Sequence, residues 1–131
     1  MILSGVKPQN STSKNFLFVS RWGETLDIAY SILLEGNQVK LFIEDKASRE
    51  IGYGFVKKVK DWKTHIEWAD VIVFDYTGYG KQCELLRESG KLVVGGSVYT
   101  DNLELDRDFG QSELKKLKIK TLPYKEFFSF Q

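Results

Sequence analysis

Three short loops carry the residues best suited to bind a ligand. Each loop follows an apolar run and combines glycine with charged or hydroxyl side chains. A glycine-bearing turn that leads into a helix presents free backbone N–H groups and the positive end of the helix dipole, which suits an anion. The predicted substrate-binding residues are Ser20, Arg21, Trp22, Gly23 and Glu24; Asp75, Thr77, Gly78 and Gly80; and Gly95, Gly96 and Ser97.

The first loop, "SRWGET", has one glycine, one arginine and two hydroxyl residues. It lacks the first two glycines of the G-x-G-x-x-G fingerprint, so a nicotinamide cofactor is not supported. A phosphate or carboxylate near Arg21 and the amides of Gly23 and Glu24 is one interpretation. The other is that Arg21 is solvated and that Trp22 packs as a lid or interface residue.

The second loop, "DYTGYGK", places Asp75 at the end of the clearest apolar run. Its carboxylate is suited to a ribose hydroxyl or a substrate amine, or to capping the helix that follows or ordering the turn. The structural role is favoured, because capping is common at such positions. Tyr76 and Tyr79 are candidate walls of a pocket.

Residues for metal or nucleophilic chemistry are scarce. The chain has one cysteine, Cys83, and one histidine, His65, too few for a disulfide or a zinc site of the usual His/Cys type. We expect both residues, and Trp62 and Trp68, to have packing or surface roles. No catalytic residue, metal site or resident cofactor is predicted, and the absence of disulfides favours a reducing, cytoplasmic location.

The 131 residues suit one domain, and the net charge of +1 gives no general reason to expect nucleic acid or a membrane surface as partner. Apolar runs are far shorter than the roughly 20 residues needed to span a bilayer. Residues 1–14 read as a polar leader without the features of a signal peptide.

The loops must be positioned by alternating strands and helices. Apolar runs predict strands at 16–19, 39–43, 70–75 and 92–94, and periodicity predicts helices at 26–33, 62–69, 82–88 and 101–118, with Asp61 as N-cap of the second. Residues 49–59 read mostly as loop, with a turn of helix as an option, and a short strand is an option at 119–123. This alternation predicts an α/β fold, an open parallel Rossmann-like sheet in three α/β/α layers over residues 15–120.

In such sheets ligands bind beyond the carboxyl ends of the strands, where all three loops lie. The predicted last helix has a main apolar stripe and a second apolar pair, Leu105 and Phe109, on nearly the opposite face. Two apolar faces suggest cover by another chain or domain. We therefore assign interdomain roles to Glu104, Asp106, Arg107 and Phe109.

Two blocks, residues 69–97 and 103–123, resemble the N-terminal part of phosphoribosylamine–glycine ligase, an ATP-grasp ligase of purine biosynthesis. The resemblance covers residues 15–128 and rests on the order of short motifs. The first loop departs from it, since the family usually has a glycine-rich loop with Arg-Glu-His there. The matching residues are Gly95, Gly96 and Ser97, Leu103 and Glu104, Arg107, and the "KIKTLP" segment.

The resemblance implies a preATP-grasp domain that helps bind a phosphoribosyl substrate but is not catalytic alone. ATP and magnesium would belong to an ATP-grasp domain expected after Gln131, with residues 121–131 leading toward it. The alternative is a stand-alone Rossmann-like binding or regulatory module. The aromatic tail further predicts homodimerisation or tail docking through Tyr124, Phe127, Phe128 and Phe130.

Overall fold

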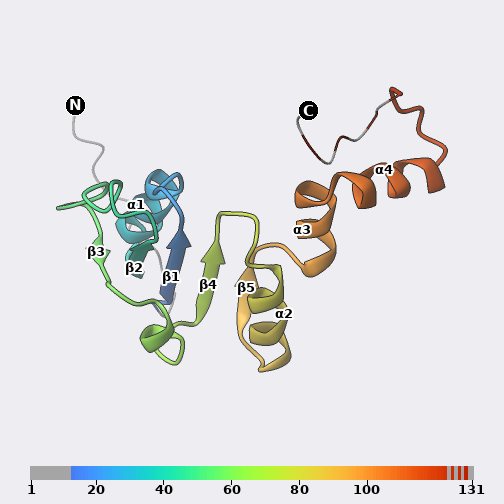
Figure 1. Ribbon diagram of the computed structural model, residues 1–131. Helices are drawn as coiled ribbons and strands as arrows, with labels where there is room; N and C mark the ends of the chain where they lie inside the picture. The colour runs from blue at the N-terminus through green and yellow to red at the C-terminus, as the bar shows by residue number, and fades with distance from the viewer. Residues whose placement is uncertain (1–12, 124, 126, 128, 130–131) are drawn as a thin grey trace, which may run out of the picture.

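A computed structural model describes residues 13–123, 125, 127 and 129 of the chain. Strands and helices alternate along most of it (Figure 1). The elements are β1 (Asn15–Ser20), α1 (Leu26–Leu34), β2 (Gln38–Ile43), β3 (Lys57–Lys58), the 3-10 helix η1 (Lys63–His65), β4 (Val71–Phe74), α2 (Gly80–Glu88), β5 (Leu92–Val94), α3 (Val98–Leu105) and α4 (Arg107–Lys116).

The five strands form one parallel sheet in the order β3-β2-β1-β4-β5. The first strand of the chain is therefore the central one, pairing with β2 on one side and β4 on the other. From β1 the strand order runs outward through β2 and β3 on one side, and through β4 and β5 on the other. The carboxyl ends of β1 and β4 are therefore the topological switch point of the sheet. The predicted α/β Rossmann-like fold is confirmed.

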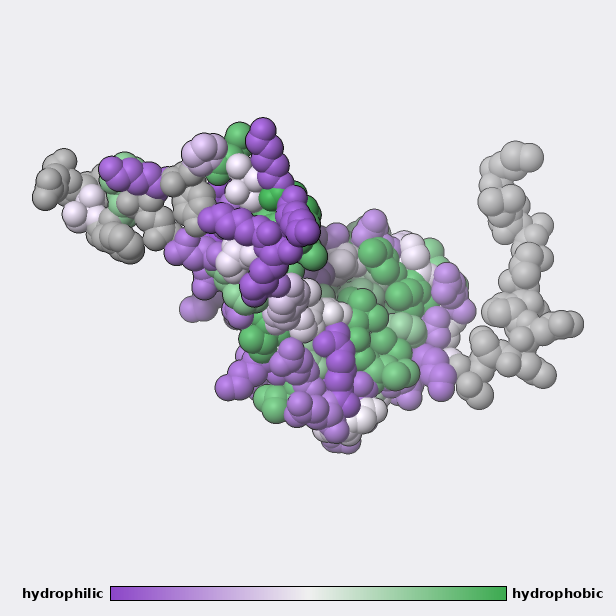
Figure 2. Space-filling model, turned by 90° about the vertical axis from the view of Figure 1, so that its right-hand side faces the viewer, coloured by the Kyte–Doolittle hydropathy of each residue, from purple (hydrophilic) through white to green (hydrophobic). Residues whose placement is uncertain are grey.

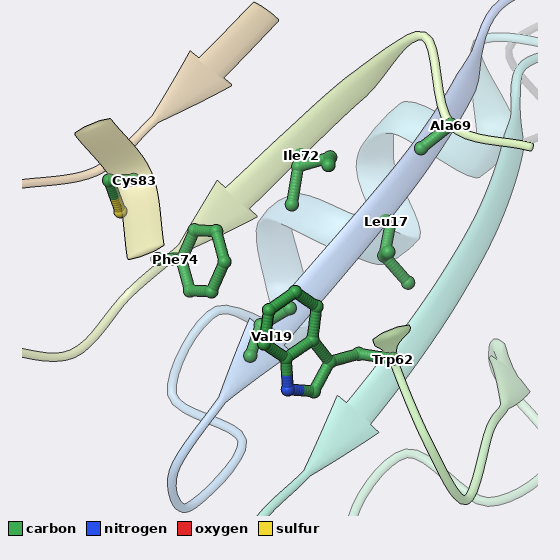
Figure 3. Close-up of a cluster of buried hydrophobic side chains, with 7 residues drawn as sticks. All are labelled: Leu17, Val19, Trp62, Ala69, Ile72, Phe74 and Cys83. Atoms are coloured by element: carbon green, nitrogen blue, oxygen red, sulfur yellow. The ribbon is translucent and has the colours of Figure 1, made fainter. Parts of the chain in front are cut away.

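Two apolar layers flank the sheet because successive residues of β1 point to opposite faces. Leu17 and Val19 are fully buried on the face covered by α2 and the segment around η1, with Trp62 and Phe74 beside them (Figure 3). Phe18 points to the other face, where Ala29 of α1 is also fully buried. The sheet is thus the middle of three layers, as the sequence predicted.

Several element boundaries differ from the sequence prediction. The expected helix at 62–69 is a single 3-10 turn, although Asp61 does accept the Lys63 amide at 3.0 Å. The expected loop at 49–59 includes the fifth strand, β3, which is only two residues long. No strand forms at 119–123.

The predicted single helix at 101–118 is wrong, because the chain breaks at Asp106. This residue is extended, with φ −111° and ψ 102°, and its carboxylate caps α4 by accepting the Phe109 amide at 2.9 Å. A short carboxylate that can accept a backbone amide favours a helix start over a helix interior, which suits Asp106 to this position. The predicted helical wheel over Leu103–Leu117 therefore spans two helices.

Helices α3 and α4 form an arm that leads away from the sheet (Figure 1). The arm packs chiefly on itself and, through α3, on α2. The edge strand β5 keeps one face open: Leu92 and Val94 are 67% and 59% exposed. Figure 2 views the molecule from the side of β5 and shows a broad hydrophobic patch there.

Helices in the described part of the chain are short. The longest, α4, has ten residues. None of them is long and apolar enough to cross a bilayer.

Candidate functional site

A cleft of about 460 Å³ lies at the switch point, beyond the carboxyl ends of β1, β2 and β4. It combines one cation with two carboxylates, aromatic rings and an exposed glycine. Its lining residues are Arg21, Glu44, Asp45, Tyr76, Thr77, Gly78, Tyr79 and Gln82. The sheet topology alone would direct a ligand to this place.

Arg21 is the cation of the cleft, and two aromatic rings hold its side chain. Its guanidinium carbon lies 4.8 Å from the Trp22 ring centroid and 4.5 Å from that of Tyr76. The two rings themselves meet edge-on at 5.0 Å. Among the described residues no acceptor takes a hydrogen bond from the guanidinium, so its donors remain for a ligand.

The two carboxylates after β2 have different roles. Asp45 folds back onto its own loop and accepts the amide and hydroxyl of Ser48, each at 2.8 Å. These hydrogen bonds hold the pKa of Asp45 below its ordinary value. Glu44 is exposed and lies beside Tyr79, whose pKa is raised to about 12 by burial and then by the Glu44 charge. Asp45 is thus engaged within its own loop, whereas the exposed Glu44 lines the cleft beside Tyr79.

The turn between β1 and α1 is closed by its own glutamate. Glu24 Oε2 accepts the Trp22 amide at 3.2 Å and the Ser20 hydroxyl at 3.1 Å. Ser20 is fully buried and its hydroxyl accepts the Gly23 amide at 2.7 Å. Gly23 needs its φ of +92°, and a side chain there would meet Ile43 and Ile51 at 2.9 Å. Of this loop, only Arg21 lines the cleft.

Asp75 does not cap α2. Its Oδ2 instead accepts the hydroxyl of Thr25, at the start of α1, at 2.7 Å. Its Oδ1 is buried without a hydrogen-bond partner among the described residues. The Asp75 side chain thus ties the end of β4 to the start of α1, a structural role different from the predicted cap.

The loop after β4 is held by the arm. Asp101 of α3 accepts the amides of Gly78 at 3.0 Å and Gly80 at 2.7 Å, and Glu104 accepts the Thr77 hydroxyl at 2.5 Å. Thr77 and Gly78 remain at the cleft. Gly80 is buried under α3, where a side chain would run into the Ser97 carbonyl. The loop therefore joins the cleft to the arm.

The third predicted loop lies outside the cleft. Arg87 donates to the carbonyls of Gly95 at 2.7 Å and Gly96 at 2.8 Å, and also to that of Val93. Ser97 is the N-cap of α3 and forms a capping box with Thr100. The glycines end the edge strand and the serine starts a helix.

The residues assigned to a domain junction lie in the arm. Glu104 and Arg107 line a second groove, between α3 and α4. Phe109 packs edge-on against Tyr99 at 5.5 Å, and Gly110 lets the two helices approach closely, since a side chain there would meet the Leu103 carbonyl at 2.9 Å. Of the second apolar pair, Leu105 and Phe109, the phenylalanine therefore makes a contact inside the arm.

Sequence reasoning missed three residues that line the cleft, Glu44, Asp45 and Gln82, and also Asp101, which holds the loop after β4. Glu44 had a signal: an acidic residue at the end of the second strand, about 20 residues after the first turn, is where ribose hydroxyls bind in dinucleotide folds. Asp101 had none, because its partners Gly78 and Gly80 become neighbours only after folding. No group of three His, Cys, Asp or Glu suited to hold a metal ion occurs within the described ranges.

Comparison of the sequence with protein-family profiles and with curated proteins finds no match. The structure is similar to shikimate dehydrogenase from Aquifex aeolicus, with a TM-score of 0.52 and 17% identity over 76% of this chain and 49% of that one. It is also similar to N5-carboxyaminoimidazole ribonucleotide synthetase from Thermotoga maritima, with a TM-score of 0.54 and 16% identity over 79% of this chain and 30% of that one. The chain spans less than half of either protein, and the likeness is one of fold.

Proposed function

We propose that this chain is a small-molecule-binding domain whose ligand is a phosphorylated ribose compound held in the switch-point cleft. Arg21 meets the phosphate, because a guanidinium fixed between two rings offers paired donors of the geometry that phosphate oxygens accept. Glu44 accepts the ribose hydroxyls. The observation that carries the proposal is that Glu44 and the Arg21 guanidinium, which forms no ion pair among the described residues, line the same cleft.

We further propose that the domain serves as the N-terminal substrate domain of a ligase similar to phosphoribosylamine–glycine ligase. The fold supports this, since N5-carboxyaminoimidazole ribonucleotide synthetase shares it over 30% of its own chain. The exposed face of β5 and the projecting arm are surfaces that a further domain would cover. ATP and magnesium would then bind elsewhere, and this chain alone would not catalyse ligation.

Calorimetric titration with ribose 5-phosphate tests the binding proposal. Arg21→Gln removes the phosphate partner and should weaken binding roughly 10- to 100-fold, the equivalent of one charge-assisted hydrogen bond. Arg49→Gln is the matched control, because Arg49 is exposed and lies outside the cleft. Equal affinity of wild type and Arg21→Gln would refute the role of Arg21.

The same titration with ATP separates the two wider functions. A substrate domain of a ligase should bind ribose 5-phosphate and not ATP. Tight binding of ATP without ribose 5-phosphate would favour the stand-alone module.

A further inference from the structure

We propose that Glu24 is a specificity-determining residue that keeps pyrophosphate out of the β1–α1 turn, so that the cleft accepts a ligand with a single phosphate on Arg21. The identity of the ligand rests on the proposed function, whereas the exclusion rests on the geometry of the turn. A domain of this fold would then reject dinucleotides by charge as well as by its missing glycines.

The position of Glu24 is that of the pyrophosphate in a dinucleotide-binding fold. There the phosphate oxygens accept backbone amides of the turn after the first strand, at the start of the first helix. Here one carboxylate oxygen accepts the Trp22 amide at 3.2 Å and the Ser20 hydroxyl at 3.1 Å. An anionic ligand would have to take the Trp22 amide from this carboxylate, and the displaced negative charge of Glu24 would still repel it from nearby.

The same arrangement recurs at the other two strand-to-helix turns on this edge. Asp101 accepts the Gly78 and Gly80 amides at the start of α2. Glu84 accepts the Val98 amide at the start of α3, at 2.9 Å. Each of the three turns is thus occupied by a carboxylate, and the three come from different parts of the chain.

Arg21, unlike the turn amides, can receive a negatively charged ligand group. Its guanidinium is the cation of the cleft; among the described residues it forms no ion pair, although its charge helps to lower the pKa of Asp45. A negatively charged ligand group is therefore accepted at the Arg21 guanidinium and refused at the turn amides. One phosphoryl group fits this pattern, and a pyrophosphate spread over the α1 terminus does not.

Titration of the full chain with inorganic pyrophosphate tests the proposal. Wild type should bind weakly, and Glu24→Ala should bind at least tenfold more tightly, with Glu24→Gln between them. Asp27→Asn is the matched control: it removes a negative charge from the first turn of α1 without touching the turn amides, and should change affinity less than threefold. Backbone NMR shifts of Trp22 and Gly23 should report the gain in Glu24→Ala.

Equal pyrophosphate affinity of wild type and both Glu24 variants would overturn the proposal, as would an equal gain in Asp27→Asn. Glu24→Gln keeps the shape of the side chain, so the test stands if Glu24→Ala does not fold. The result is independent of ribose 5-phosphate: loss of that binding in Arg21→Gln tests the proposed function, and gain of pyrophosphate tests Glu24.

Discussion

Replacement of Gly80 by alanine sets two physical effects against each other. Gly80 is the first residue of α2 and is helical, so alanine should favour the helix by about 1 kcal/mol. The new methyl group, however, would lie against the Ser97 carbonyl and 2.6 Å from Asp101 Oδ2. Backbone at the start of α3 would have to move, and overpacking of this kind costs about 1–3 kcal/mol.

We expect the clash to exceed the helix gain, because the obstructing atoms belong to backbone and to a carboxylate already bound to two amides. Taking the upper end of that range, the difference is about 2 kcal/mol of lost stability, or a fall in Tm of roughly 5–10 °C for a domain of this size. The lost stability comes from the packing of α3 against α2, so the sheet should stay folded.

Thermal unfolding and hydrogen exchange measure the two parts of this prediction. In Gly80→Ala, hydrogen exchange should accelerate at the amides of residues 78 and 80 and along α3, whereas the amides of β1 should stay protected. Lys81→Ala, one residue along on an exposed position, is the control and should stay within about 0.5 kcal/mol of wild type. A Gly80→Ala protein as stable as wild type, with unchanged exchange in α3, would refute the packing argument.

Three further predictions concern the edge strand, the cleft and the arm. Arg87→Ala should cost about 1 kcal/mol and increase self-association in light scattering, because three carbonyls at the end of β5 lose their donor; an unchanged scattering mass and an unchanged Tm would contradict this. Tyr79 should ionise near pH 12, and since its folded pKa is raised, its contribution to stability is present below the ordinary pKa of about 10 and falls as pH rises toward 12. Difference spectroscopy of wild type against Tyr79→Phe would show this late step, and its absence would count against the burial of that phenol. Asp106→Ala should cost about 1 kcal/mol of α4 stability, seen as lost helical circular dichroism on mild heating, whereas Asp108→Ala, which is not the cap, should cost less.

The central strands were predictable because burial on both faces leaves a short apolar run that few other elements produce. Residues 16–19 and 71–74 are such runs. β3 was missed for the converse reason: Lys57 and Lys58 form a two-residue edge strand that buries little, so no apolar run marks it. Strand pairing there comes from the neighbouring β2, and the local sequence carries no trace of it.

The position of the candidate cleft could be predicted from the sequence, but the hydrogen-bond partners of its residues could not. Strand-end loops meet at one edge in any parallel sheet, which placed Arg21, Thr77 and Gly78 correctly at the switch point. The hydrogen bonds of Asp75 and Asp101 cross 50 and more than 20 residues of sequence respectively. Periodicity over short windows does not encode such partners. The break at Asp106 was missed because Leu103, Leu114 and Leu117 keep a helical spacing across it.

The central place of β1 has a consequence for synthesis of the chain. This strand emerges first, yet both of its neighbours come later, β2 at Gln38–Ile43 and β4 at Val71–Phe74. Until Phe74 has left the ribosome, Leu17 and Val19 lack the strand and the rings that bury them in the finished protein. The nascent chain thus carries β1 with one edge and one apolar face uncovered until more than 50 further residues have been added, a long window in which a chaperone can bind it or another chain can pair with it.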